Sequence, residues 1–152
     1  MKMPLPELIE TMPMFAHFTT DEKNQFAEMK HSLVKFKKDE NIITEGEQTK
    51  SLYLLVQGTC LITKTEDDAK IRLSKLSPGE IFGEMSFFSN KPRQSSVSAT
   101  EDVLVVKMND DFFKKVSPDI RDKIKDYLIG LLINRLDNMN AAIMRISKLM
   151  RG

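Results

Sequence analysis

The chain has 152 residues and a mass of 17.4 kDa, enough for one domain whose core needs neither disulfides nor a structural metal. Its 23 Lys plus Arg nearly balance 22 Asp plus Glu, and the net charge of +1 argues against a nucleic-acid-binding protein, which carries a basic excess. Cys60 is the single cysteine, so no disulfide forms within the chain and we expect a reducing, cytoplasmic location. The longest apolar run, 127–133, is too short to span a bilayer, so no membrane segment is expected.

The first 31 residues predict a helix, a turn and a second helix. Leu5, Leu8 and Ile9 share one helical face. Pro13 is expected to end the first helix, because its ring blocks the preceding turn. Thr20, followed by acidic residues, is typical of a capped helix start.

From residue 32 to residue 109 the pattern changes to short β-strands with frequent turns. Strands are expected at 33–36, 42–43, 52–56, 59–64, 71–76, 96–99 and 103–108. Gln57 and Gly58 predict a tight hairpin turn between the third and fourth of these strands. Many short strands joined by turns favour an α+β fold with an antiparallel, jelly-roll-like β-roll between the N-terminal helices and a long C-terminal helix.

After residue 109 the hydrophobic period is helical again. Asn109 or Asp110 can cap a short helix, and Pro118 is well placed at the start of a long one. The later part of the long helix carries an apolar stripe at every third or fourth residue: Leu132, Leu136, Met139, Ile143, Ile146 and Met150. Such a stripe either pairs two copies as a coiled coil or packs back on the domain.

The most unusual stretch, 82–97, lies between two predicted strands where a tight turn would suffice. Gly83 permits close approach of the backbone, and the residues after it can form a helical turn whose free N–H groups suit an anion. Arg93 supplies a permanent charge with a forked donor geometry suited to phosphate. Glu84 can accept a hydrogen bond from a sugar hydroxyl. These residues predict a sugar-phosphate site, whereas an exposed Glu84–Arg93 salt bridge is the plainer alternative.

The order Phe-Gly-Glu, apolar residue, small residue, then Pro-Arg, resembles the phosphate-binding cassette of the cyclic-nucleotide-binding domain family, and flanking features extend the resemblance over the whole chain. This family includes the catabolite activator protein, protein kinase A regulatory subunits and cyclic-nucleotide-gated channels. The resemblance implies one domain over 1–152, with N-terminal helices at 1–31, a β-roll at 32–109 holding the cassette at 82–97, and C-terminal helices at 110–152.

The resemblance also implies a ligand site and roles within it. Its ligand-binding residues would be Phe82, Gly83, Glu84, Met85, Ser86, Arg93, Gln94 and Ser95. Glu84 would bind the ribose 2′-hydroxyl and Arg93 the cyclic phosphate. Gln94 and Ser95 depart from the family at positions linked to the choice of base; we expect cAMP more than cGMP. Candidate residues to cap the base are Asn134, Arg135 and Asn138.

We therefore expect a receptor module that couples binding of a cyclic nucleotide to movement of its C-terminal helices and acts on an effector protein, with a homodimer through the last helix as one arrangement. Nothing near the cassette offers a metal site or a base–nucleophile pair, so neither catalysis nor a cofactor is expected. A cupin-like enzyme would need histidines in the β zone, which has none. A DNA-binding regulator would need a helix-turn-helix, which this sequence lacks. An interaction module that keeps the fold without the ligand is the alternative.

Overall fold

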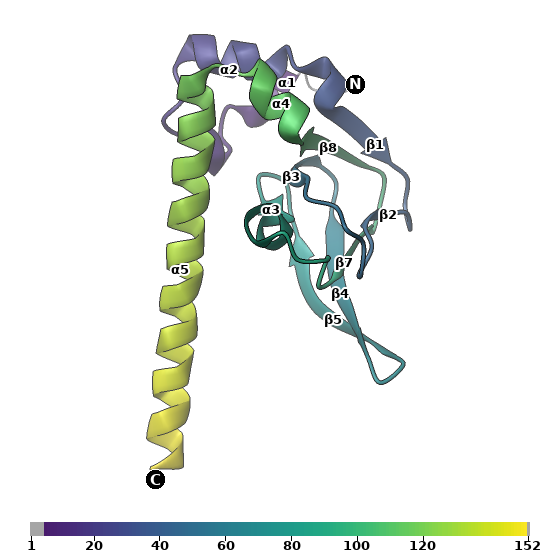
Figure 1. Cartoon of the computed structure of the whole chain (residues 1–152), viewed down its shortest axis with the longest axis vertical. Helices are drawn as coiled ribbons and strands as arrows, with labels where there is room; N and C mark the ends of the chain where they lie inside the picture. Colours follow the sequence, from purple (N-terminus) through teal and green to yellow (C-terminus); the bar gives the residue numbers. More distant parts are fainter. Residues whose placement is uncertain (1–4, 152) are drawn as a thin grey trace. The chain divides into compact units, whose positions relative to one another are not determined.

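The computed structural model describes residues 5–151, so the predicted domain limits at Met1 and Gly152 lie outside the described residues. The chain divides into two units, one ending at Ser117 and the other beginning at Pro118 (Figure 1). The first unit contains the N-terminal helices, both sheets and two short helices, and the second contains one long helix.

Residues 5–32, the described part of the N-terminal segment, form four short helical elements. They are α1 (Leu5–Ile9), the 3-10 helix η1 (Pro13–Phe15), α2 (Thr20–Ala27) and the 3-10 helix η2 (Lys30–Ser32). Pro13 does not end α1 but starts η1, where the fixed φ of proline suits a first helical position. The cap of α2 is Thr19, one residue earlier than predicted, because its side chain and that of Glu22 form a reciprocal capping box.

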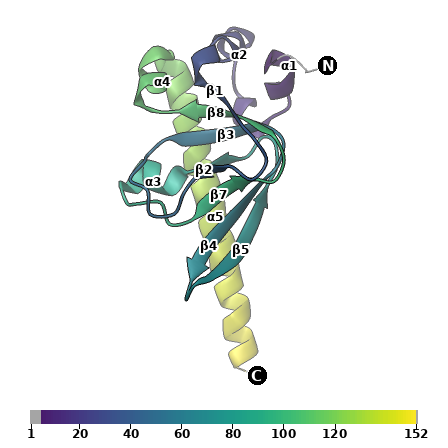
Figure 2. The ribbon, with the colours of Figure 1, turned by 90° about the vertical axis from the view of Figure 1, so that its right-hand side faces the viewer.

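Within residues 5–151, eight strands form two four-stranded antiparallel sheets, which confirms the predicted fold class (Figure 2). The strands are β1 (Leu33–Phe36), β2 (Asn41–Ile43), β3 (Leu52–Gln57), β4 (Cys60–Glu66), β5 (Ala69–Leu76), β6 (Ile81–Phe82), β7 (Ser96–Ala99) and β8 (Val103–Met108). Their order is β1-β8-β3-β6 in one sheet and β2-β7-β4-β5 in the other. The two-residue strand β6 was not predicted, since so short a run shows no alternation.

The two sheets bury a shared apolar core. Its members are Ile42, Ile43, Tyr53, Leu55, Cys60, Leu76, Phe82, Val97, Ala99, Val103 and Val105. Along β7 the side chains of Val97 and Ala99 are buried and those of Ser96 and Ser98 are only partly buried, as the period of two in a strand requires. Cys60 is a buried member of this core, as predicted, and burial raises the pKa of its thiol to about 11.

The turn at Gln57–Gly58 corrects one prediction. It is not a hairpin, because β3 pairs with β6 and β8 while β4 pairs with β5 and β7, so the turn carries the chain from one sheet to the other. Gly58 has φ 88°, and a Cβ there would lie 2.6 Å from the carbonyl oxygen of Asp102. Only glycine fits this crossing without strain.

Two helices follow the last strand. Helix α4 (Asp110–Lys115) is capped by Asn109, whose side-chain oxygen accepts the N–H of Phe112 at 2.9 Å. Helix α5 (Pro118–Met150) has 33 residues and starts at proline, as predicted. Its exposed large apolar residues are Ile129, Ile133, Leu136, Met139, Ile143, Met144, Ile146, Leu149 and Met150. Within residues 5–151 no helix has the length and apolar character needed to cross a membrane.

Candidate functional site

The predicted binding loop joins β6 to β7 and contains the six-residue helix α3 (Glu84–Ser89). Phe82, at the end of β6, is buried and stacks on Tyr53 of β3 with a centroid distance of 5.3 Å. This aromatic pair anchors the start of the loop in the core. Phe82 therefore supports the loop from its core side, through its packing on Tyr53.

Gly83 links β6 to α3 in the left-handed conformation, with φ 88°. A Cβ at this position would lie 2.9 Å from the carbonyl oxygen of Ser51 and 3.0 Å from Nη1 of Arg93. The sequence predicted a close approach at Gly83, and the structure identifies the neighbours. They are Ser51, the residue directly before β3, and the predicted phosphate-binding arginine.

Arg93 is buried, with 3% of its surface exposed, and its guanidinium group is held by three oxygens. The Nε–H donates to Oγ1 of Thr49 at 2.9 Å. Nη1 donates to the carbonyl oxygen of Gly83 at 3.0 Å, and Nη2 to that of Ser51 at 2.7 Å. These bonds use three of the five N–H donors of the guanidinium, so one remains on each terminal nitrogen.

The backbone of Arg93 is fixed by the same loop between β2 and β3. Its N–H donates to the carbonyl oxygen of Glu47 at 2.9 Å, and its carbonyl oxygen accepts the N–H of Gly46 at 2.8 Å. The loop from Gly46 to Ser51 therefore grips Arg93 from both its main chain and its side chain. Sequence reasoning missed Thr49 and Ser51, because no local pattern connects them to a residue more than forty positions later.

The positive charge of Arg93 has only neutral hydrogen-bond partners. Within residues 5–151 the structure shows no ion pair to Arg93, so the exposed Glu84–Arg93 salt bridge considered from the sequence does not form. Burial lowers the pKa of Arg93, whereas nearby Tyr53, Glu47 and Glu84 act in the opposite direction. Burial likewise raises the pKa of Tyr53, and the charge of Arg93 opposes that shift. Burying a cation whose hydrogen bonds all go to neutral groups costs free energy, and binding an anion beside it would lower that cost.

The other predicted site residues divide by exposure. Glu84 and Ser86 on α3 are buried beside Gly83. Met85, with 55% of its surface exposed, and Gln94 face solvent, whereas Ser95 is partly buried. The structure thus joins Gly83 and Arg93 directly, buries Glu84 and Ser86 on the helix that follows Gly83, and leaves Met85, Gln94 and Ser95 more exposed.

The three candidate base-capping residues, Asn134, Arg135 and Asn138, lie on the exposed part of α5. They belong to the second unit, and their role stays a prediction. For the part of the chain that the structure describes, no group of three or more His, Cys, Asp or Glu side chains is arranged to hold a metal ion.

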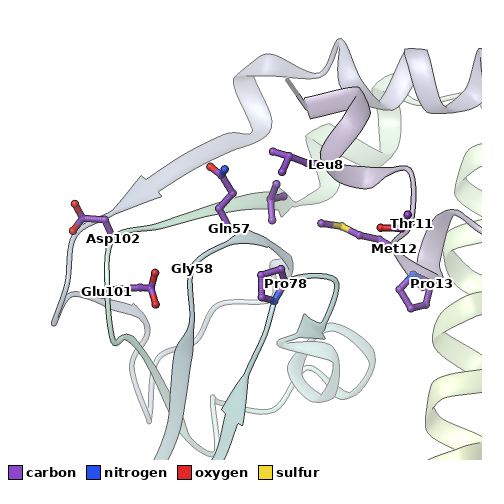
Figure 3. A pocket seen from close by; sticks show the side chains of 10 residues that line it. Leu8, Thr11, Met12, Pro13, Gln57, Gly58, Pro78, Glu101 and Asp102 are labelled. Atoms are coloured by element: carbon purple, nitrogen blue, oxygen red, sulfur yellow. The ribbon is translucent and has the colours of Figure 1, made fainter. Parts of the chain in front are cut away.

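A separate pocket of about 600 Å³ lies between the N-terminal helices and the turns at Gly58 and Pro78 (Figure 3). Leu8 and Met12 give it an apolar wall, and Glu101 lies on the opposite side. None of the residues of the 82–97 loop lines this pocket. It is therefore distinct from the predicted anion site.

Comparison with known proteins agrees with this geometry. The family model described as cyclic nucleotide-binding domain matches residues 33–117. The cAMP-dependent protein kinase regulatory subunit of Debaryomyces hansenii is 27% identical over 119 residues, which are 78% of this chain and 25% of that protein. The CRP-like cAMP-activated global transcriptional regulator of Mycobacterium tuberculosis is 31% identical over 108 residues, covering 70% of this chain and 48% of that protein.

Among solved structures, the catabolite activator protein of Thermus thermophilus has a TM-score of 0.73 at 22% identity, covering 89% of this chain and 63% of that chain. This likeness shows a shared fold. The chain spans less than half the length of the two curated relatives above, so it corresponds to one part of each.

Proposed function

The chain belongs to the cyclic nucleotide-binding domain family, and from this premise we propose that it is a regulatory module that binds cAMP in preference to cGMP. The relative from Debaryomyces hansenii is a regulatory subunit of a cAMP-dependent kinase and that from Mycobacterium tuberculosis is a cAMP-activated regulator, which supports the choice of adenine over guanine. In this proposal the chain performs no catalysis of its own. It uses no cofactor beyond the nucleotide that it senses.

The observation that carries the proposal is the buried charge of Arg93, whose side-chain hydrogen bonds go to neutral oxygens. Three neutral oxygens orient its guanidinium, and two N–H donors remain on the terminal nitrogens. A cyclic phosphate carries one negative charge and two free oxygens, which match the positive charge of Arg93 and its two remaining donors. An anion of this kind would convert a costly buried cation into a stabilised pair.

The neighbouring residues fit the sugar that accompanies such a phosphate. Glu84 is buried at the start of α3, one residue after Gly83, and its carboxylate can accept the hydrogen bond of a ribose 2′-hydroxyl. Ser86 is also buried on this helix, and we assign it to the frame around the ribose phosphate together with Gly83 and Met85. Gln94 and Ser95 follow Arg93, where they border the ligand.

Binding is proposed to act on the C-terminal helices and, through them, on an effector protein. The physical basis is a shift of population: the nucleotide stabilises whichever arrangement of helices lets its base be covered, with Asn134, Arg135 and Asn138 as candidate caps. The exposed stripe on α5 that includes Leu136 and Ile143 suits pairing with a second copy. Sedimentation at several concentrations tests this arrangement, since a dimer predicts a rise in mass that Leu136→Glu abolishes.

Calorimetric titration with cAMP and cGMP tests the binding proposal. The wild type should bind cAMP more tightly, and Arg93→Ala should lose about 2–4 kcal/mol of binding free energy by removing a charged partner of the phosphate. Arg72→Ala, which removes an exposed arginine from β5, is the matched control and should bind as the wild type does. Failure of the wild type to bind either nucleotide would sink the receptor function and favour an interaction module that keeps only the fold.

A further inference from the structure

We infer that Thr49 is a positioning residue for the bound nucleotide, acting through Arg93 and without touching the ligand itself. The inference rests on the proposed function, because it assigns to Thr49 the task of aiming the guanidinium at a phosphate. The observation is the 2.9 Å hydrogen bond from Nε of Arg93 to Oγ1 of Thr49. It joins residues of two loops that are 44 positions apart in the sequence.

This hydrogen bond completes the set of three that fixes the orientation of the guanidinium plane. The two carbonyl oxygens, of Gly83 and Ser51, each take a donor from a terminal nitrogen. The bond at Nε adds a third fixed point to the guanidinium and so restricts its rotation at the end of the long side chain of Arg93. Three fixed points define a plane, so the two remaining N–H donors keep one direction.

Thr49 is also the only side chain among these three partners, since Gly83 and Ser51 contribute backbone carbonyls. Its own position is set by the loop that pairs with the main chain of Arg93, through Gly46 and Glu47. The residue is exposed, so its hydroxyl is not needed to fill the core. Thr49 thus orients Arg93 through one hydrogen bond and contributes little to the packing of the core.

The consequence for binding follows from preorganisation. When the guanidinium already has the orientation that the phosphate requires, the ligand meets no cost of ordering a flexible side chain. Without the Thr49 hydroxyl, the Nε–H loses its partner in a buried site, and the guanidinium turns to find another acceptor. The donors intended for the phosphate are then misdirected in part of the population.

The experiment compares wild type, Thr49→Val and Thr49→Ser by calorimetric titration with cAMP. Valine keeps the shape of threonine without the hydroxyl, and we expect its Kd for cAMP to rise about tenfold. Serine keeps the hydroxyl and should restore a Kd within about threefold of the wild type. Thermal unfolding of each variant checks that the fold is retained, as the exposure of Thr49 predicts.

An NMR signal from Arg93 distinguishes a changed orientation of its guanidinium from a general disturbance of the fold. In the ligand-free protein labelled with nitrogen-15, the Nε–H signal of Arg93, identified by its loss in Arg93→Gln, should be shifted in Thr49→Val and close to the wild-type position in Thr49→Ser. Unchanged Kd and unchanged Nε–H signal in Thr49→Val would overturn the inference while leaving the proposed function intact. A wild type that binds neither cAMP nor cGMP would overturn both.

Discussion

Two glycine turns of the first unit use the same backbone conformation for different purposes. Gly58 and Gly83 both have φ 88°, in the region that favours glycine. A Cβ at Gly58 would meet the backbone oxygen of Asp102 at 2.6 Å. A Cβ at Gly83 would meet the carbonyl oxygen of Ser51 at 2.9 Å and Nη1 of Arg93 at 3.0 Å.

The difference lies in what each turn brings together. At Gly58 the chain crosses between the two sheets, and its neighbours belong to the framework. At Gly83 the carbonyl oxygen itself holds Arg93, so the turn is part of the anion site. In both turns the left-handed glycine allows a close approach of the backbone, and its neighbours decide whether that approach serves the fold or the ligand.

The largest effect is expected from Gly58→Ala. Strain at positive φ and the contact with a backbone oxygen that cannot move should lower the free energy of unfolding by about 3 kcal/mol. Urea denaturation followed by circular dichroism measures this loss. The Kd for cAMP, taken on the folded fraction, should stay unchanged, and a matching loss of affinity would erase the distinction between the two turns.

Gly83→Ala should act mainly on binding. The added methyl group displaces the guanidinium of Arg93 and disturbs its bond to the Gly83 carbonyl, so the affinity for cAMP should fall by about 30-fold, or about 2 kcal/mol. Calorimetry measures the affinity, and denaturation should show a smaller loss of stability than in Gly58→Ala. Equal affinities of Gly83→Ala and wild type would show that this turn has no part in the site.

The smallest effect is expected from Thr59→Val, a threonine beside the Gly58 turn that serves as the counterpart of Thr49. The Oγ1 of Thr59 lies in hydrogen-bond contact with that of Thr100 and donates to Glu101 at 3.0 Å. Removing the hydroxyl should lower the free energy of unfolding by about 1 kcal/mol and leave cAMP binding unchanged. A tenfold higher Kd for cAMP in this variant would mean that loss of a threonine hydroxyl affects binding wherever it occurs.

The sequence predicted much of this molecule where local patterns are strong. Strands β7 and β8 have the predicted bounds, since alternation and turn residues define them on both sides. The pairing of strands was harder to predict, because sheet membership depends on partners that are distant in the sequence. For this reason the turn at Gly58 was wrongly assigned to a hairpin.

In the candidate site, too, local sequence patterns predicted some residues and missed those that depend on tertiary contacts. Gly83 and Arg93 carry recognisable chemistry within one loop, and the structure brings them within hydrogen-bond distance, as their assignment to one site requires. Thr49 has no such signature, because its importance comes only from the loop that tertiary folding places against Arg93. Residues that orient a binding group are in general found through the fold.

The central claim, that Arg93 meets the phosphate of a cyclic nucleotide, is tested most directly by a thermodynamic cycle. Calorimetry would compare cAMP with adenosine, which lacks the phosphate, on wild type and on Arg93→Gln. We expect wild type to prefer cAMP by about 100-fold and Arg93→Gln to lose most of this preference. The same preference in both proteins would contradict the assignment.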